Sequence, residues 1–379
     1  MITRRSVLAG TIAAGCAGAA RSAAPAPSLA DVAGAAGLLY GASIGREALD
    51  DPAYADLYRR ETRIVTTDVA LKFDWLRPTP DRYEFGPADA ILRAAEANGK
   101  LVRGHTLIWN DNAPAWLKRL SGREVERIFD EHIDTVVERY AGRLHSWDVV
   151  NEPFWPMDHI AGGWRDGPWF AAMGPAYVER AFRRVAAIDR AAKLTLNEAQ
   201  CDNDRDWGRA IRPLLRGLAD RLLDTGVPLH AIGLQSHLQP QWPANYEEFA
   251  AYAAAFGARG LEVYLTEFDV NDDGFQDDVG ARDSAVAATC HSFLTAALAT
   301  PAVKMVVNWQ LSDRYSWLRD VWRRERPASR RTPRPLPFDA DFAAKPMREA
   351  MLAAFGARKA VSPAPQRKPE QPQAVRPRE

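Results

Sequence analysis

Residues 147–153 read Trp-Asp-Val-Val-Asn-Glu-Pro, a run whose apolar middle ends abruptly in an amide, a carboxylate and a proline. An apolar, β-branched run of this kind is typical of a strand buried on both faces, as in a parallel sheet. Because proline cannot donate to a sheet ladder, we expect the strand to end next to Glu152. A carboxylate at the end of a buried strand indicates either a structural ion pair or a chemical role.

Seven further runs of the same type recur along the chain, with helical periodicity between them. The expected strands are 38–45, 64–69, 101–109, 146–152, 193–198, 231–238, 262–270 and 303–309. Segments 124–140, 176–191 and 246–259 have the length and apolar spacing of covering helices. Eight strand–helix units predict an α/β fold, the single-domain (β/α)8 TIM barrel. A doubly wound open sheet is the alternative, although no G-x-G-x-x-G turn follows the first strand.

Composition favours a globular protein with a neutral partner. The chain has 379 residues, 47% of them hydrophobic, and Lys+Arg balances Asp+Glu at 49 each. This balance gives no overall attraction for nucleic acid or for an anionic membrane surface. The twelve tryptophans offer flat apolar faces that suit sugar rings as well as a protein core. No His/Cys cluster has zinc spacing, so we expect no metal, and we expect no cofactor. We also expect the protein to be a monomer.

The two ends of the chain differ from its centre. Residues 1–24 read as a twin-arginine signal peptide, with Arg4-Arg5 before a small-residue run too short to span a membrane. We therefore expect export to the periplasm or the medium. The alternative is a lipoprotein anchored through Cys16. Residues 356–379 are rich in proline and arginine and predict a disordered tail, which leaves 31–355 as the catalytic barrel.

Two cysteines, Cys201 and Cys290, remain after the signal peptide. They are compatible with one disulfide in an oxidising compartment or with two buried thiols, and the sequence leaves both interpretations open.

Polar side chains gather at the expected strand ends, and the carboxyl ends of barrel strands form the catalytic face. Glu152 ends the fourth expected strand and Glu267 lies in the seventh. Paired carboxylates at one barrel mouth are typical of glycoside hydrolysis, in which one acid protonates the leaving oxygen and the other attacks the anomeric carbon or activates water. A lone acid is equally explained by an ion pair. Two acids among other polar strand ends favour catalysis.

Five motifs occur in order along the domain: GHTLIW at 104–109, WDVVNEP at 147–153, GLQSHL at 233–238, LTEFD at 265–269 and SDRYSW at 312–317. Together they resemble the motifs of glycoside hydrolase family 10, the endo-β-1,4-xylanases of barrel fold. The resemblance implies that xylan or xylo-oligosaccharides are cleaved by a retaining double displacement. It also implies that Glu152 is the general acid/base and Glu267 the nucleophile.

Further roles follow from this resemblance together with side-chain chemistry. Asn151 offers an amide to the substrate 2-hydroxyl, and His237 with Asp269 can keep Glu267 ionised. Glu152 must stay protonated near neutral pH, so burial and nearby charge are expected to raise its pKa. The resemblance implies sugar binding by Lys72, His105, Trp109, Gln235, Trp309 and Trp317. The alternative is that these residues are ion-pair partners or core.

The chain departs from the family pattern at three places. Val69 stands where an amide usually occurs, and Asn110 replaces a histidine. Glu198 stands in an altered Asn-Glu-Ala-Gln segment, as a changed binding residue or a structural acid. Two alternatives to a xylanase are a related retaining barrel glycosidase acting on β-glucan or mannan, and a catalytically dead polysaccharide-binding protein. A pure binder needs aromatic side chains but no acid/base pair.

Overall fold

A computed structural model describes residues 26–325 and 331–358 of the chain. Eight parallel strands form the barrel: β1 (Leu39–Ser43), β2 (Ile64–Thr66), β3 (Leu101–Gly104), β5 (Ser146–Asn151), β6 (Lys193–Glu198), β7 (Ala231–Leu234), β9 (Glu262–Val270) and β10 (Val303–Asn308). Neighbouring strands pair in this order, and pairing of β9 with β10 closes the ring. The predicted TIM barrel is confirmed, and the doubly wound alternative is wrong.

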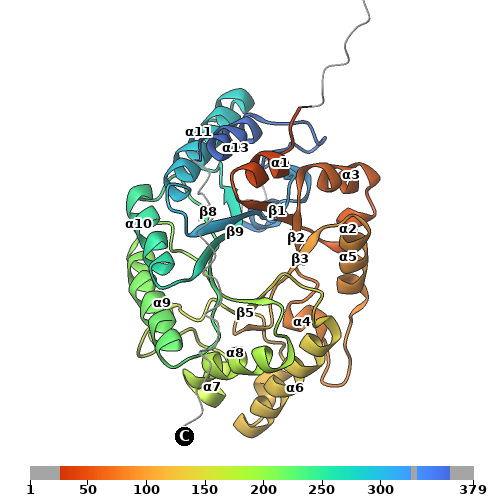
Figure 1. The fold of residues 1–379 in the computed structure, drawn as a ribbon, viewed down its shortest axis with the longest axis vertical. Helices are drawn as coiled ribbons and strands as arrows, with labels where there is room; N and C mark the ends of the chain where they lie inside the picture. Colours follow the sequence, from red (N-terminus) through yellow and green to blue (C-terminus); the bar gives the residue numbers. More distant parts are fainter. Residues whose placement is uncertain (1–25, 326–330, 359–379) are drawn as a thin grey trace, which may run out of the picture.

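Helices surround the barrel on its outside (Figure 1). They are α1 (Leu29–Ala35), α2 (Arg46–Leu49), α3 (Pro52–Glu61), α4 (Phe73–Leu76), α5 (Gly86–Ala97), α6 (Gly122–Tyr140), α7 (Pro168–Met173), α8 (Ala176–Ile188), α9 (Asp206–Asp224), α10 (Tyr246–Gly257), α11 (Val279–Ala297), α12 (Leu318–Glu325) and α13 (Pro346–Ala357). Three 3-10 turns lie at Leu117–Arg119, Pro156–Asp158 and Asp313–Tyr315. The three helices expected from the sequence correspond to α6, α8 and α10.

Helix α6 illustrates how the local sequence fixes an element. Ser121 accepts a hydrogen bond from the backbone N–H of Glu124, whose carboxylate accepts the N–H of Ser121, so a capping box starts the helix. Buried residues then recur at helical spacing, from Val125 through Ile128 and Phe129 to Tyr140. This stripe packs the helix against the barrel, while its polar face remains outside.

Two expected strands are interrupted close to the barrel mouth. The segment 101–109 forms β3 and then the short β4 (Ile108–Trp109), which pairs with β5. The segment 231–238 forms β7 and then β8 (His237–Leu238), which pairs with β9. Ser236, between β7 and β8, has a positive φ of 63°. His105 lies in the interruption between β3 and β4, and Gln235 lies in the interruption between β7 and β8.

The described residues contain no helix that is both long enough and apolar enough to cross a membrane. Cys201 and Cys290 are buried free thiols, which decides between the two interpretations of these residues. The predicted signal peptide, including Cys16, lies outside the described residues, as does the predicted tail from residue 359 onward.

Candidate active site

The two predicted catalytic carboxylates lie at the same end of the barrel and belong to one hydrogen-bonded network. Glu152 directly follows β5, and Glu267 lies in β9. Asn197, in β6, joins them: its Nδ2 donates to Oε1 of Glu267 at 2.9 Å and to Oδ1 of Asn151 at 2.7 Å. Asn151 in turn donates to Oε1 of Glu152 at 3.2 Å. Two asparagine amides therefore span the distance between the carboxylates.

Glu267 sits in an environment that favours its ionised form. It is only 5% exposed, and this burial acts to raise its pKa. The hydrogen bond from His237, whose Nε2 lies 3.3 Å from Oε2, and the positive charges of His237 and Lys72 together outweigh the effect of burial. The pKa of Glu267 therefore lies below its usual value, so the group is a carboxylate at neutral pH.

His237 acts as a cationic donor to this carboxylate. Burial alone acts to lower its pKa, but Asp269, whose Oδ2 lies 3.0 Å from Nδ1, and Glu267 raise that pKa to about 10. Both ring nitrogens of the protonated imidazole can then donate, one to Asp269 and one to Glu267. Trp317 Nε1 donates to the same Asp269 oxygen at 2.8 Å. Asp269 therefore fixes the orientation of His237.

Glu152 experiences the opposite balance. Burial raises its pKa, and the negative charges of Glu267 and Asp111 add to this effect. Arg165 and Gln235 oppose it, through Arg165 Nη2 at 2.9 Å from Oε2 and Gln235 Nε2 at 2.7 Å from Oε1. The net result is a raised pKa, which is the direction expected of a proton donor.

The positive φ of Glu152, 48°, shows how sharply the chain leaves β5. Its backbone N–H still pairs with the carbonyl of Asn197 at 2.9 Å, and Pro153 then ends the strand. Arg165 Nε donates to the carbonyl of Glu152 at 2.8 Å, so the same guanidinium holds both the backbone and the side chain of Glu152. The conformation of this turn therefore aims the carboxylate into the mouth.

His105 is held as a neutral ring. Burial lowers its pKa to about 3, and its Nδ1 lies 2.8 Å from Oδ2 of the buried Asp148. Asp148 also accepts a hydrogen bond from Arg103 inside the barrel. An ionised Asp148 can only accept, so His105 donates through Nδ1 and keeps Nε2 as an acceptor.

Most of the predicted sugar-binding residues gather around Glu267, whereas the Gln235 side chain contacts Glu152. The Lys72 ammonium lies over the rings of Trp109 and Trp309, at 5.2 and 5.5 Å from their centroids. The Trp309 ring meets the ring of His105 edge-on at 5.1 Å. Trp317 is 37% exposed, with its centroid 5.1 Å from that of His237. The structure therefore brings all of the predicted site residues into one connected cluster.

Two departures from the family pattern have structural explanations. Oδ1 of Asn110 accepts the backbone N–H of Trp169 at 3.2 Å, in the first turn of α7, so Asn110 supplies a cap to that helix. Glu198 is fully buried, and its two oxygens accept the backbone N–H groups of Phe154 and Ala199. Burial raises its pKa well above the usual value. The geometry favours a structural acid over a binding residue.

Two members of the network were absent from the residues predicted from the sequence. Asn197 lies near the end of the expected strand 193–198, and the alternation of side chains along a strand could have identified it as pointing into the barrel. Arg165 lies in the loop between β5 and α7, thirteen positions after Glu152. No periodicity marks a loop residue, so no signal in the sequence pointed to Arg165.

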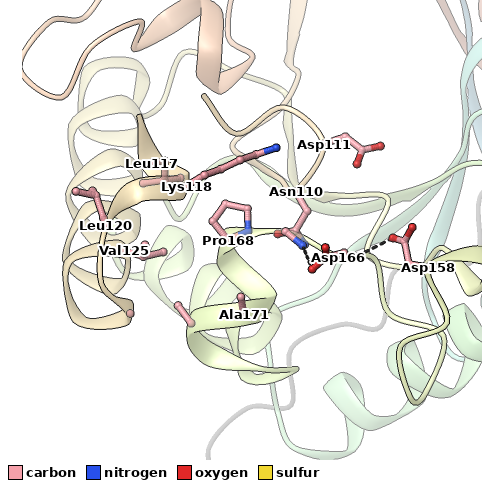
Figure 2. A pocket seen from close by; sticks show the side chains of 13 residues that line it. Asn110, Asp111, Leu117, Lys118, Leu120, Val125, Asp158, Asp166, Pro168 and Ala171 are labelled. Carbon is pink, nitrogen blue, oxygen red and sulfur yellow. Dashed lines mark hydrogen bonds between the residues drawn. The ribbon is translucent and has the colours of Figure 1, made fainter. Parts of the chain in front are cut away.

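A pocket of about 540 Å³ opens beside this network, between the segment after β4 and helix α7 (Figure 2). Its polar lining includes Asn110, Asp111, Asp158 and Asp166. Asp111 also forms an ion pair with Arg165, whose other terminal nitrogen contacts Glu152. Asp111 therefore stands between the pocket and the carboxylate. Among the described residues, His, Cys, Asp and Glu side chains form no group suited to holding a metal ion.

The sequence that forms this site also matches a known protein family. Residues 28–354 match the model of glycosyl hydrolase family 10. The chain belongs to this family. It is 31% identical over 273 residues to endo-1,4-beta-xylanase B of Thermotoga neapolitana, covering 71% of this chain and 75% of that protein. It is 34% identical over 218 residues to a beta-1,4-xylanase of Dictyoglomus thermophilum, covering 58% and 60% of the two chains.

Solved structures of family 10 proteins have the same fold. Xylanase 10B from Thermotoga petrophila RKU-1, crystallised in complex with xylobiose, superposes with a TM-score of 0.77 at 29% identity, over 86% of this chain and 97% of that one. Native xylanase 10B from Thermotoga maritima gives a TM-score of 0.75, also at 29% identity. Each of the two superpositions covers 86% of this chain.

Proposed function

We propose that the protein is an endo-1,4-β-xylanase that hydrolyses xylan with retention of anomeric configuration. Glu152 is the general acid/base and Glu267 the nucleophile. This assignment rests on one observation: the two pKa values are shifted in opposite directions. Burial raises the pKa of Glu152, whereas the hydrogen bond from His237 holds the pKa of Glu267 low. Titratable groups whose environments separate their pKa values in this way suit one acid and one nucleophile.

In the first step, the Glu267 carboxylate attacks the anomeric carbon while the glycosidic C–O bond breaks. The leaving oxygen takes the proton of Glu152, and a covalent glycosyl ester forms on Glu267. Neutralisation of Glu267 in this ester removes a negative charge that had raised the pKa of Glu152. Glu152 is therefore a stronger acid after the first step, and its carboxylate is ready to act as a base.

In the second step, Glu152 takes a proton from water, and the resulting hydroxide oxygen bonds to the anomeric carbon as the ester bond to Glu267 breaks. The side-chain amide of Asn151 forms a hydrogen bond with the substrate 2-hydroxyl. This bond becomes stronger as positive charge develops on the sugar ring in the transition state. Arg165 and Gln235 keep Glu152 in position through both proton transfers. His237 stabilises Glu267 as the leaving carboxylate.

The two roles can be separated by chemical rescue of alanine variants. Glu267→Ala should be inactive, and azide should restore cleavage of an aryl xyloside by entering from the vacated face, which gives the α-azide. Glu152→Ala should keep the first step with a good leaving group such as dinitrophenol, and azide should then give the β-azide. Rescue products of the reverse configuration would exchange the two assignments, and full activity in either variant would refute them.

Substrate class is tested by incubating the purified protein with glucuronoxylan, carboxymethylcellulose and mannan and sizing the products. Internal cleavage of xylan alone supports the proposal, which rests on the kinship with the named xylanases. Cleavage of glucan or mannan alone would overturn the xylan assignment, and binding without cleavage would indicate a dead enzyme. Size-exclusion chromatography with light scattering in the same preparation tests the proposed monomer.

We also propose that residues 1–24 export the protein through the twin-arginine route, on the strength of Arg4-Arg5 and the short apolar run. Mass spectrometry of the mature chain, together with fractionation of the cells, tests this proposal. Replacement of both arginines by lysine should retain the precursor inside the cell. A mature chain that begins with a lipidated Cys16 would instead show that the protein is a lipoprotein anchored through this residue.

A further inference from the structure

The pocket beside Arg165 has a polar side and an apolar side. It lies where the segment after β4, the 3-10 turn at Leu117–Arg119, the loop after β5 and helix α7 meet. Figure 2 shows carboxylates on one side of this space and aliphatic side chains on the other. The polar lining residues include Asn110, Asp111, Asp158 and Asp166, and the apolar ones are Leu117, Leu120, Val125, Pro168, Ala171 and Ala172. A ligand that fits here needs both hydrogen-bonding groups and an apolar face.

The polar side of the pocket has spare acceptor capacity. Oδ2 of Asp158 accepts the backbone N–H of Asp166 at 2.8 Å, and Oδ1 of Asp166 accepts the backbone N–H of Gly167 at 2.8 Å. These hydrogen bonds hold both side chains in place. Each carboxylate keeps a second oxygen, and Asp158 and Asp166 are both exposed, so they can accept hydrogen bonds from a ligand.

The same pocket also offers donors. Oδ1 of Asn110 accepts the N–H of Trp169, which fixes the orientation of the amide. Its Nδ2 has no hydrogen-bond partner among residues 26–325 and 331–358, although Asn110 is only 4% exposed. A buried donor without a partner is costly, and a ligand oxygen can supply that partner directly or through one water. The exposed Lys118 adds an ammonium donor, and in Figure 2 its side chain extends over the pocket toward the polar side.

This combination of groups matches a neutral sugar. A hydroxyl group both donates and accepts, so one sugar ring can satisfy the carboxylates and the two donors together. The apolar face of the ring can pack against aliphatic side chains such as Leu120 and Val125. An acidic sugar fits less well, because three carboxylates and one ammonium line the pocket. The lining therefore favours neutral sugars over uronic acids.

A single guanidinium separates the pocket from the general acid/base. One terminal nitrogen of Arg165 pairs with Asp111 in the pocket lining, and the other lies 2.9 Å from the Glu152 carboxylate. In the proposed function, Glu152 contacts the glycosidic oxygen of the scissile bond. A sugar attached as a branch to a main-chain unit next to that bond is therefore close enough to enter the pocket while the main chain stays in the mouth.

We propose that this pocket binds a neutral sugar branch of xylan, attached to a main-chain unit beside the scissile bond. The inference rests on the proposed function, because that function places the glycosidic oxygen at Glu152. Contacts to the branch add to those of the main chain, so the enzyme cleaves next to a neutral branch more efficiently than in an unbranched stretch. A glucuronosyl branch at the same position gains no such advantage.

The test compares unbranched xylohexaose with xylohexaoses that carry one arabinofuranosyl branch, placed on each successive unit. For the wild type, kcat/KM should be about tenfold higher for the isomer whose branch enters the pocket, and product masses should place the cut beside the branched unit. Ala171→Trp fills the pocket from α7 and should remove this advantage, while cleavage of the unbranched hexamer stays within about twofold. Lys118→Ala should reduce the advantage about two- to fivefold, as for one lost hydrogen bond.

Ala251→Trp is the matched control, because Ala251 is an exposed alanine of α10 and does not line the pocket. It should keep the full advantage of the branched isomer. Equal kcat/KM for the unbranched and all branched hexamers in the wild type, or an advantage that survives both pocket variants, would overturn this inference alone. An equal advantage for a glucuronosyl branch would overturn its restriction to neutral sugars. Wild-type protein that cleaves none of the hexamers would overturn the proposed function and this inference with it.

Discussion

Gly233 leaves the space that the side chain of Asn197 occupies: a Cβ atom built on Gly233 would lie 2.1 Å from Oδ1 of Asn197. The two residues are directly paired between β7 and β6. Asn197 needs this space because its Nδ2 reaches Glu267 while its Oδ1 accepts the hydroxyl of Thr266 at 2.7 Å. The glycine at the start of GLQSHL is therefore part of the architecture of the site.

Gly233→Ala should displace the Asn197 amide and disconnect it from Glu267. We expect kcat to fall roughly 100-fold or more, as when one preorganised donor is lost, with a smaller change in KM. Overpacking should also reduce the free energy of unfolding by about 1–3 kcal/mol. Steady-state kinetics and urea unfolding measure the two effects.

Gly217→Ala is the control for this variant. Gly217 lies inside α9 with no atom within 4 Å of its added Cβ, so alanine there should leave kcat unchanged. The better helix propensity should raise the free energy of unfolding by about 0.5–1 kcal/mol. Full kcat in the Gly233 variant would mean that Asn197 has no part in positioning Glu267.

Asp111 adds to the larger effect of burial in raising the pKa of Glu152, so we expect it to extend activity to higher pH. Its negative charge raises the pKa of Glu152, so Asp111→Asn should lower that pKa. The active enzyme needs protonated Glu152, and the alkaline limb of kcat/KM should therefore move to lower pH. Because the Asp111 side chain is half-exposed, we expect a shift smaller than about one pH unit.

A pH profile of kcat/KM on an unactivated xylo-oligosaccharide measures this shift. Asp166→Asn is the matched control, since Asp166 lines the same pocket but forms no ion pair with Arg165. Its alkaline limb should stay in place. Movement of the limb to higher pH in Asp111→Asn would contradict the sign of the electrostatic argument.

The fold was accessible from the sequence because each barrel strand has a strong local signal. β5 is buried at all six positions and β9 at eight of nine, and both read as largely apolar runs with polar residues at or near their carboxyl ends. The common location of the site residues followed from the barrel fold, since the carboxyl ends of its parallel strands meet at one face. The site residues on strands, such as Glu267 and His237, could be predicted for the same reason.

Loop residues could not be predicted in this way. Arg165 reaches Glu152 only because the loop between β5 and α7 folds back, with Arg165 N–H donating to the carbonyl of Pro153 at 2.9 Å. Such a contact depends on three-dimensional closure and leaves no periodic trace.

His237 sets the lower pH limit through Glu267. The hydrogen bond and charge of His237 lower the pKa of Glu267, so His237→Ala should raise it. Because the nucleophile must be ionised, the acidic limb of kcat/KM should move to higher pH. Loss of the donor should also reduce kcat by about 100- to 1000-fold at the optimum.

The control is His291→Ala, on the exposed face of α11, which should change neither the limb nor kcat. Kinetics across the acidic range distinguish a specific effect from general damage, because a merely destabilised protein loses amplitude without moving the limb. An acidic limb that stays in place in His237→Ala would refute the assigned role.

Stability depends on an ion pair on which the first and last helices converge. Arg348, in α13, lies 3.2 Å from the carboxylate of Glu61 at the end of α3, and both side chains are over 90% buried. The same carboxylate accepts the N–H of Leu29, the first residue of α1, at 2.9 Å. Glu61→Ala removes the buried carboxylate partner of Arg348 and leaves it only the exposed Glu349, at 3.1 Å, as an ion-pair partner. We therefore expect the free energy of unfolding to fall by about 3–5 kcal/mol. The control is Glu179→Ala, which removes an exposed i,i+4 ion pair with Arg183 and should lower the free energy of unfolding by less than about 1 kcal/mol. Urea unfolding measures both losses, and equal losses in the two variants would show that burial gives the Glu61 pair no special weight.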